Sequence, residues 1–255
     1  MTAVLLSSEA ELTVQAHVGL KAQLSSSAAA DNAEPGLLVT MSEIDSASCN
    51  GAYLYGTPPL DAVLDAIDGL RDHGRPFQVS LRSRHRHLYE AKLADIGLSM
   101  MADLPLMVVR PDMFRPIPCP AELRLRILDA EDGSHLPLVA QGLNMGLDAL
   151  EQVMSPANRA TDCWTGYTGE VDDELAVTGT AIASCEGAGL ISIVTDPRFG
   201  RRGFGGALTS AAVTDAFAQG LPRVFLHASA QGAGLYERLG FETLESLLVF
   251  GRADG

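Results

Sequence analysis

The 255-residue chain contains no run of about 20 consecutive apolar residues, the length that a helix needs to cross the core of a bilayer. Its N-terminus also lacks the basic region and the sustained apolar stretch of a secretory signal. We therefore expect no membrane-spanning helix and a cytoplasmic location.

Cysteines are few and widely spaced, at Cys49, Cys119, Cys163 and Cys185. No two of them form a CxxC pair, and no group of histidines lies near them in the sequence. A structural zinc site draws its ligands from such closely spaced pairs, so we expect no bound metal. Separate cysteines in a chain of this length are typical of reduced thiols.

Basic residues are scarce, because 18 Lys and Arg face 32 Asp and Glu and leave a net charge of -14. So acidic a surface repels nucleic acid and anionic membranes, and we expect neither as a partner. It suits cationic partners such as amines and basic protein tails. The same charge also serves solubility alone.

Prolines gather near the middle of the chain, between Arg110 and Pro120. Proline fixes φ and has no amide donor, which excludes a helix or a central strand there. We read this stretch as a stiff linker. The predicted organisation is an N-terminal domain at 1–112, a linker at 113–122 and a second domain at 123–255.

The second domain alternates between the periods of helices and strands, and turn residues separate its apolar runs. We predict a strand at 123–128, a helical region at 133–154, three strands at 163–170, 175–184 and 190–195, a helix at 205–219, a strand at 224–226, a helix at 232–239 and a strand at 244–251. The three consecutive strands indicate an antiparallel meander.

The two halves echo one another. Residues 76–81 are followed by Leu88-Tyr89-Glu90, and residues 222–226 are followed by Leu235-Tyr236-Glu237. A helix-like segment precedes each strand, at 60–70 and at 207–217. We predict two related α/β domains, with chance similarity of short segments as the alternative.

The segment after the third meander strand contains the most informative residues. Thr195 ends the strand, and a loop with Arg201, Arg202, Gly203, Gly205 and Gly206 leads into the next helix. The first turn of a helix offers unpaired amides and a positive dipole end, and glycines let an anion approach them. The loop is therefore suited to a pyrophosphate, although a tight turn without a ligand is the alternative.

Two other phosphate-binding motifs are excluded. No Gly-Lys-Ser or Gly-Lys-Thr follows the glycines, as a P-loop requires. A dinucleotide fingerprint would need a third glycine where Leu208 stands.

This order of elements resembles the GCN5-related N-acetyltransferase (GNAT) family over residues 123–251. Gly203 and Gly205 match the glycines of its acetyl-CoA loop, and residues 235–241 (LYERLGF) match its late helix. The loop's usual leading Arg or Gln falls on Gly200, so Arg201 and Arg202 would supply the charge. Where the family often has Asn before the late helix, Ser229 stands nearby.

The resemblance implies an α/β (α+β) fold of tandem GNAT-like domains, each a mixed, mostly antiparallel sheet flanked by helices. It implies an N-acetyltransferase that moves an acetyl group from acetyl-CoA to a primary amine acceptor by direct attack. Tyr236 matches the acid that protonates the leaving thiolate, or else it packs against the coenzyme arm. The implied coenzyme-binding residues are Ile193, Val194 and Thr195 for the pantetheine arm, the amides of Arg201, Arg202, Gly203, Phe204, Gly205 and Gly206 for the pyrophosphate, and Ser229.

Other roles stay open in the sequence. Glu186, His227 or a water chain through Ser192 are candidates for the general base. Trp164 and Tyr167 either line the acceptor pocket or pack in the core. The acidic residues 172–174 either attract a cationic acceptor or form a solvated turn.

The N-terminal half departs from the family's loop. Its equivalent segment, 55–59, contains two prolines and no arginine, so we predict a degenerate relative that does not hold CoA, with Tyr89 as a remnant. The basic run 82–87 contacts the coenzyme's 3′-phosphate, contacts a partner, or is an exposed helix start. A non-catalytic CoA-binding or regulatory module is the alternative function. The acceptor, the acyl length and the oligomeric state are not specified by the sequence.

Overall fold

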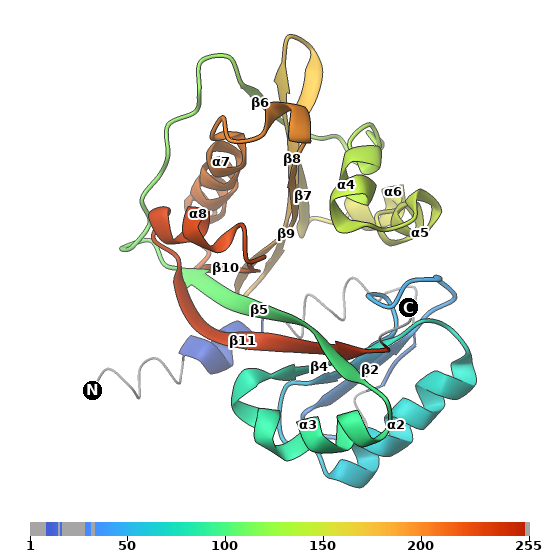
Figure 1. Cartoon of the computed structure of the whole chain (residues 1–255). Helices are drawn as coiled ribbons and strands as arrows, with labels where there is room; N and C mark the ends of the chain where they lie inside the picture. Colours follow the sequence, from blue (N-terminus) through green and yellow to red (C-terminus); the bar gives the residue numbers. More distant parts are fainter. Residues whose placement is uncertain (1–8, 15, 17–28, 32–33, 253–255) are drawn as a thin grey trace. The chain divides into compact units, whose positions relative to one another are not determined.

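The computed structural model describes residues 9–14, 16, 29–31 and 34–252 (Figure 1). Internal contacts divide the chain into two compact units. As far as the structure describes them, unit 1 comprises residues 1–10, 21–106 and 243–255, and unit 2 comprises residues 11–20 and 107–242. Within the described part, no helix is both long and apolar enough to cross a membrane.

Unit 2 contains the predicted meander followed by the predicted helix, strand and helix. Its elements are β6 (Arg124–Ile127), α4 (Leu136–Leu143), α5 (Leu147–Val153), α6 (Pro156–Arg159), β7 (Trp164–Val171), β8 (Glu174–Ser184), β9 (Gly187–Thr195), the 3-10 turn η2 (Pro197–Phe199), α7 (Phe204–Ala218), β10 (Val224–His227) and α8 (Ala233–Arg238). Strands β6 to β9 pair antiparallel in sequence order, and β10 pairs parallel to β9.

Local residue choices explain where these elements end. Asp172 and Asp173 both adopt positive φ, 51° and 62°, between β7 and β8, as a tight hairpin turn requires. The predicted helical region at 133–154 forms two helices, because Asn144 takes the left-handed conformation at the end of α4 and Gly146 precedes α5.

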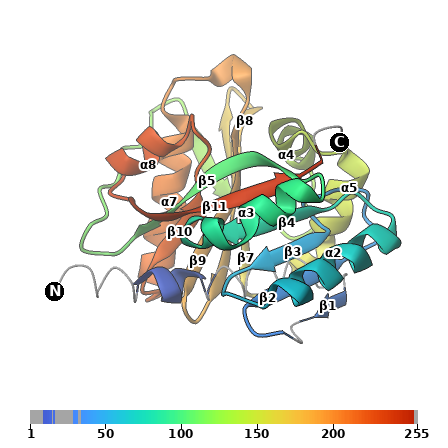
Figure 2. The same cartoon turned by 60° about the horizontal axis from the view of Figure 1, so that its bottom comes forward.

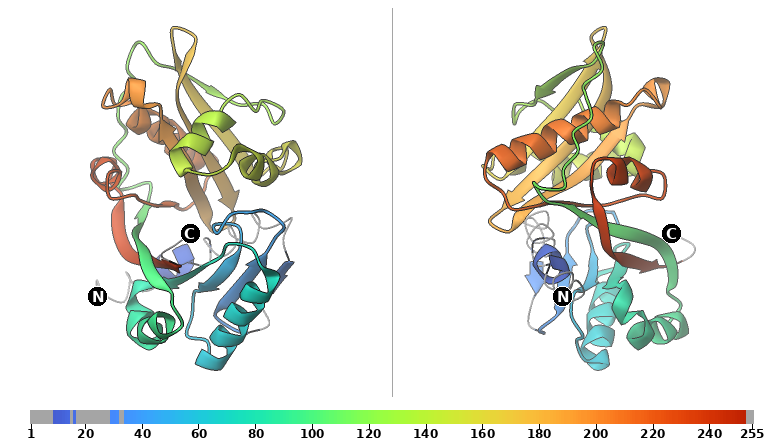
Figure 3. Two further views of the ribbon diagram at one scale, coloured as in Figure 1. Left: turned by 45° about the vertical axis from the view of Figure 1, so that its right-hand side comes forward. Right: turned by 90° about the vertical axis from the view of Figure 1, so that its left-hand side faces the viewer.

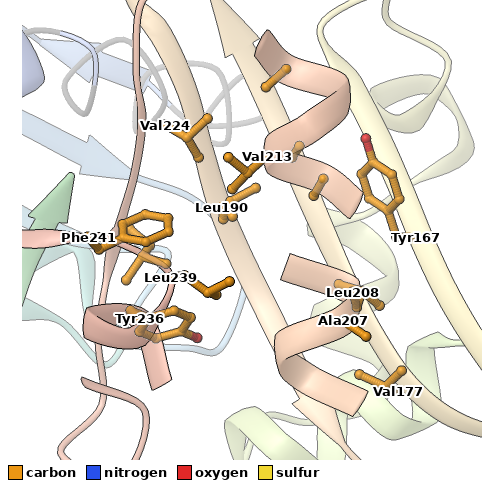
Figure 4. Packing of buried hydrophobic residues seen from close by; sticks show 14 of the residues in the cluster. Tyr167, Val177, Leu190, Ala207, Leu208, Val213, Val224, Tyr236, Leu239 and Phe241 are labelled. Atoms are coloured by element: carbon orange, nitrogen blue, oxygen red, sulfur yellow. The ribbon is translucent and has the colours of Figure 1, made fainter. Parts of the chain in front are cut away.

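The two faces of the unit 2 sheet are covered by different helices, with α7 on one face and α4 on the other (Figure 3). Small side chains of α7, such as Ala207 and Ala212, let this helix lie close to the strands within the main core. Figure 4 shows Leu208 of α7 beside Val177 of β8 in this cluster. A separate cluster around Val139 and Leu150 lies under α4 and α5.

Unit 1 has the same kind of architecture with fewer strands. Its elements are β1 (Ala29–Asp31), β2 (Leu37–Met41), β3 (Gly51–Leu54), α2 (Leu60–His73), β4 (Gln78–Arg82), the 3-10 turn η1 (Ser83–His85), α3 (Arg86–Asp95), most of β5 (Ser99–Val109) and β11 (Glu242–Gly251). Its strand order is β1-β2-β3-β4-β11-β5, and α2 and α3 lie on one face (Figure 2). Thus the predicted fold class, a mostly antiparallel α/β fold with flanking helices, is confirmed.

The internal echo corresponds to a repeated path of the chain. In unit 1 the path is β3, α2, β4, α3 and β5, with β3 and β4 parallel. The path β9, α7, β10, α8 and β11 repeats it, again with a parallel first pair.

The last strand of each repeat is grouped with the other unit. Strand β11 pairs antiparallel with β4 from Leu247 opposite Arg82 to Phe250 opposite Val79, so it belongs to unit 1. Residues 107–109 at the end of β5 belong to unit 2, where this strand neighbours β10. The compact units are therefore interleaved along the chain, whereas the predicted boundaries at 112 and 123 divide it once and stay a prediction.

The proline-rich segment is attached along unit 2. The amide of Arg115 donates to the carbonyl of Leu239 at 3.0 Å, and the amide of Ile117 donates to the hydroxyl of Ser210 at 2.8 Å. The segment from 113 to 122 thus has anchored positions within one unit, which a free spacer would not have.

Candidate functional site

The parallel strands β9 and β10 pair over a short length. Their register comprises Ala188 opposite Val224 and Gly189 opposite Phe225. Beyond Gly189, the described residues of β9 pair only with β8. A pocket of about 330 Å³ forms where the two strands separate. It is lined by Gly142, Leu143, Gly189, Leu190, Ile191, Ser192, Ile193, Val194, Phe225, Leu226, His227, Ser229 and Tyr236.

A β-bulge shapes the β9 wall of this pocket. Ser192 and Ile193 together face the single residue Gly179 of β8, and Ser192 takes a φ of +54°. A side chain at Gly179 would lie 2.7 Å from a methyl of Leu208, so glycine gives the bulge and α7 room to approach. Bulges re-aim side chains and leave a residue outside the regular ladder, which is how Ser192 comes to line the pocket.

The N-terminus of α7 lies just after β9 and has no side-chain cap. Gly203 is the N-cap residue, with a φ of 84° that favours glycine. The amides from Arg201 to Gly206 donate to no acceptor among the residues that the structure describes. Six free amides at a helix start, with the positive end of the dipole, are suited to bind an anion.

The glycines of this loop serve different purposes. A Cβ at Gly205 would lie 3.3 Å from the Thr195 hydroxyl oxygen, whereas a Cβ at Gly206 would lie 3.0 Å from a methyl of Leu235. Gly206 is thus needed for packing of α7 against α8. The side chain of Phe204 is buried in the core, so only its amide can face a ligand.

The two arginines of the loop differ as well. Arg201 is exposed, takes a φ of 59°, and forms no ion pair with any described residue. The guanidinium carbon of Arg202 lies 4.9 Å from the ring centre of Phe204, and one of its nitrogens lies 3.3 Å from Glu122. Arg201 is therefore the arginine whose charge is available to an anion.

Tyr236 lies on α8 and lines the pocket. Its residue is only 9% exposed, and its ring centre lies 5.7 Å from that of Phe241 (Figure 4). Burial raises the pKa of the phenol above its ordinary value, so the hydroxyl keeps its proton at neutral pH. Ser229 lines the same pocket, and its hydroxyl accepts a hydrogen bond from the Gly232 amide at 3.1 Å.

The structure brings some predicted residues together and separates others. Ile193, Val194, Ser229 and Tyr236 line the pocket together with Ser192 and His227, whereas Thr195 and the loop 201–206 lie beside it along the chain. Glu186 is not among the lining residues: it precedes the opposite end of β9, where its carboxylate lies 3.8 Å from Arg223.

Two aromatic residues pack in cores rather than in the pocket. Trp164 contacts the cluster under α4 and α5. Tyr167 is buried in the main core, and burial together with Asp215 raises the pKa of its phenol (Figure 4). Neither residue lines this pocket, and both pack as the alternative of core packing describes.

The α4 wall of the pocket was not predicted from the sequence. Gly142 and Leu143 line the pocket, and a side chain at Gly142 would overlap that of Val194. A glycine inside an apolar helix was the signal available, because it indicates close approach of another element.

The acidic turn has partners of its own. Asp173 pairs with Arg124 at 2.7 Å, and Glu174 pairs with Arg198 at 2.8 Å. Neither carboxylate lines the pocket.

The structure of unit 1 shows where the basic run 82–87 and Tyr89 lie. The basic run 82–87 is not wholly an exposed helix start, because Arg82 is buried and pairs with Glu245 at 2.7 Å. The hydroxyl of Tyr89 donates to the carbonyl of Pro58 at 2.7 Å, inside the segment that corresponds to the phosphate loop. No group of three or more His, Cys, Asp or Glu among the described residues is placed to hold a metal ion.

Residues 163–243 match the family described as "Acetyltransferase (GNAT) domain". The predicted GNAT resemblance of the C-terminal half is thereby confirmed. A search of curated proteins found no match.

Solved structures share the fold over most of the chain. A GCN5-related N-acetyltransferase from Kribbella flavida has a TM-score of 0.75 and 18% identity, with 96% of each chain covered. A tandem GNAT protein from the clavulanic acid biosynthesis pathway has a TM-score of 0.58 and 14% identity, covering 84% of this chain and 77% of that one. A GCN5-related N-acetyltransferase from Sphaerobacter thermophilus has a TM-score of 0.57 and 14% identity, covering 78% and 71%.

Proposed function

We propose that the chain transfers an acetyl group from acetyl-CoA to a primary amine. The observation that carries this proposal is the row of amides from Arg201 to Gly206, which have no acceptor among the described residues and lie where β9 leads into α7. Both acetyl-CoA and its product contain a pyrophosphate, the kind of anion that such a helix start stabilises.

The remaining parts of acetyl-CoA have candidate partners nearby. The pantetheine arm resembles a peptide, and around Ile193 and Val194 no strand among the described residues pairs with β9 on the pocket side. Arg201 supplies positive charge near the phosphates, and Thr195 and Ser229 supply hydroxyls.

Acetyl transfer requires formation of a C–N bond, cleavage of the C–S bond and two proton transfers. A neutral amine attacks the thioester carbonyl carbon, so that the C–N bond forms and the C–S bond breaks. The Tyr236 hydroxyl, kept protonated by burial, donates its proton to the leaving sulfur. His227 or a water held by Ser192 accepts the proton from the amine, since both residues line the pocket and Glu186 does not.

Replacing Tyr236 with Phe tests the proton donor. We expect kcat to fall about 100-fold, because general acid catalysis typically contributes at least this much. The KM for acetyl-CoA should hardly change, because the ring and its contact with Phe241 remain. The matched control is Tyr89→Phe, which removes the hydroxyl from the corresponding tyrosine of unit 1 and should leave kcat unchanged. Equal kcat in Tyr236→Phe and the unmodified protein would show that this tyrosine only packs.

Replacing Arg201 and Arg202 together with Ala tests the coenzyme site itself. We expect acetyl-CoA affinity, measured by calorimetry, to fall about tenfold or more, because each charge-assisted contact to phosphate contributes about 1 kcal/mol or more. The control is the double change Arg124→Ala and Arg126→Ala on β6, which removes the same net charge away from the loop. If the two double variants bind acetyl-CoA equally well, the loop does not hold the coenzyme. Tight coenzyme binding without thiol release from any amine would instead support a non-catalytic CoA-binding module.

A further inference from the structure

Helices on both faces of the unit 2 sheet contribute to the pocket. Tyr236 comes from α8, while Gly142 and Leu143 come from the C-terminal end of α4. Figure 3 shows α4 on the face opposite α7, whose N-terminus carries the coenzyme site proposed above. The α4 side is therefore the side left for the amine acceptor.

This side presents large apolar side chains to solvent. Leu143 lines the pocket and is 45% exposed, and Leu147 at the start of α5 is 39% exposed. The left-handed Asn144 and the following Gly146 end one helix and start the next, which places both leucines at one bend. Apolar area left in water at a pocket wall is stabilised when an apolar ligand covers it.

The pocket also lacks the groups that a polycation would need. Among its lining residues, His227 and Tyr236 are the titratable ones, and none is a carboxylate. Asp148, which follows Leu147 at the start of α5, does not line the pocket. Neither does the acidic run 172–174, where Asp173 pairs with Arg124 and Glu174 pairs with Arg198. A second ammonium group in this pocket would lose water without gaining an ion pair, which is costly.

We infer that, given the proposed acetyltransferase function, the acceptor is a primary amine on an uncharged apolar body, such as an alkylamine or an arylalkylamine. The body lies against Leu143 in the pocket wall and extends toward the exposed Leu147 at the start of α5, and the amine points toward the bulge at Ser192. Polyamines, aminoglycoside-like compounds and lysines in basic tails are poor acceptors on this basis.

The test compares two amines of the same length that differ by one charge, hexylamine and hexamethylenediamine. Release of the CoA thiol is followed with the full chain and saturating acetyl-CoA. We expect kcat/KM for hexylamine to be about tenfold or more higher, because only the diamine must desolvate a second ammonium. Equal or better use of the diamine would overturn the inference while leaving acetyl transfer intact.

The variant Leu143→Asp examines the wall directly. A carboxylate there should lower kcat/KM for hexylamine and raise it for hexamethylenediamine, so that the preference shrinks or reverses. The KM for acetyl-CoA should stay the same. The control is Ile127→Asp, the same type of change at a 60% exposed residue of β6 that does not line the pocket.

The possible results separate the inference from the function on which it rests. If Leu143→Asp raises the KM for acetyl-CoA and leaves the amine preference unchanged, Leu143 covers the coenzyme and the inference is wrong. If neither these amines nor a lysine peptide releases thiol although acetyl-CoA binds, the proposed function itself fails.

Discussion

A chain that begins at residue 113 should neither unfold cooperatively nor bind acetyl-CoA, although it retains the whole predicted second domain. The reason is the end of β5, where Met107 and Val109 are fully buried in the main core of unit 2. Leu239 and Phe241 belong to the same cluster. Without the end of β5, strand β10 loses its neighbour on one side, and an unpaired strand edge next to the pocket is exposed.

The expected loss is large. Two fully buried aliphatic side chains alone correspond to about 4–10 kcal/mol by comparison with truncations to alanine, which is comparable to the stability of a whole domain. Circular dichroism during heating and calorimetry with acetyl-CoA would measure it. As a control, residues 1–112 and 113–255 are produced together as separate chains. They should co-purify and recover acetyl-CoA binding, because each piece contains a strand that the other piece's compact unit includes. A cooperative transition and coenzyme binding by 113–255 alone would show that unit 2 does not need the end of β5.

This exchange of strands explains a limit of what the sequence predicts. The apolar pattern at 244–251 correctly indicates a strand, and β11 spans Glu242–Gly251. The alternation of apolar and polar residues along a strand depends on which of its faces is buried, not on which neighbouring strand supplies the hydrogen bonds. The pairing of β11 with β4, about 165 positions earlier in the chain, therefore leaves no local signal.

The candidate site shows the same division between local and long-range information. The loop with Gly203 was predictable because positive φ and free amides at a helix start depend on adjacent residues. The position of Leu143 in the pocket wall was not predictable, because α4 reaches β9 through a tertiary contact of Gly142 with Val194. Tyr167 illustrates a third case: its strand was predicted, but the choice between pocket and core depends on where α7 lies.

For Arg82, the neighbouring sequence indicates exposure to solvent, whereas the structure buries its side chain. It belongs to a run of arginines and histidines that is typical of a solvated segment, yet its side chain is 2% exposed. Its Nε donates to Glu245 of β11 at 2.7 Å, and Nη1 donates to the carbonyl of Tyr55 at 3.2 Å. Burial of this guanidinium is possible because its counter-charge arrives on β11, next to β4.

Replacing Glu245 with Ala should therefore lower the free energy of unfolding by about 3–5 kcal/mol, because it removes the carboxylate that lies 2.7 Å from a buried guanidinium. Glu245 itself is 9% exposed, so water cannot readily take its place. The decrease in the free energy of unfolding reflects weaker attachment of β11 to unit 1. Urea denaturation measures this decrease. The matched control is Glu242→Ala on the same strand, where the side chain is 45% exposed and lies 3.9 Å from Arg110. That change should cost about 1 kcal/mol or less, as exposed pairs usually do.

A second variant separates the loss of charge pairing from the loss of packing. Changing Arg82 to Met and Glu245 to Leu together removes both charges and keeps apolar volume, so most of the lost stability should return. If Glu245→Ala costs no more than Glu242→Ala, the pair does not hold β11 in unit 1. If the double variant is as unstable as Glu245→Ala, the bond from Arg82 to the Tyr55 carbonyl, rather than the ion pair, fixes the end of β4.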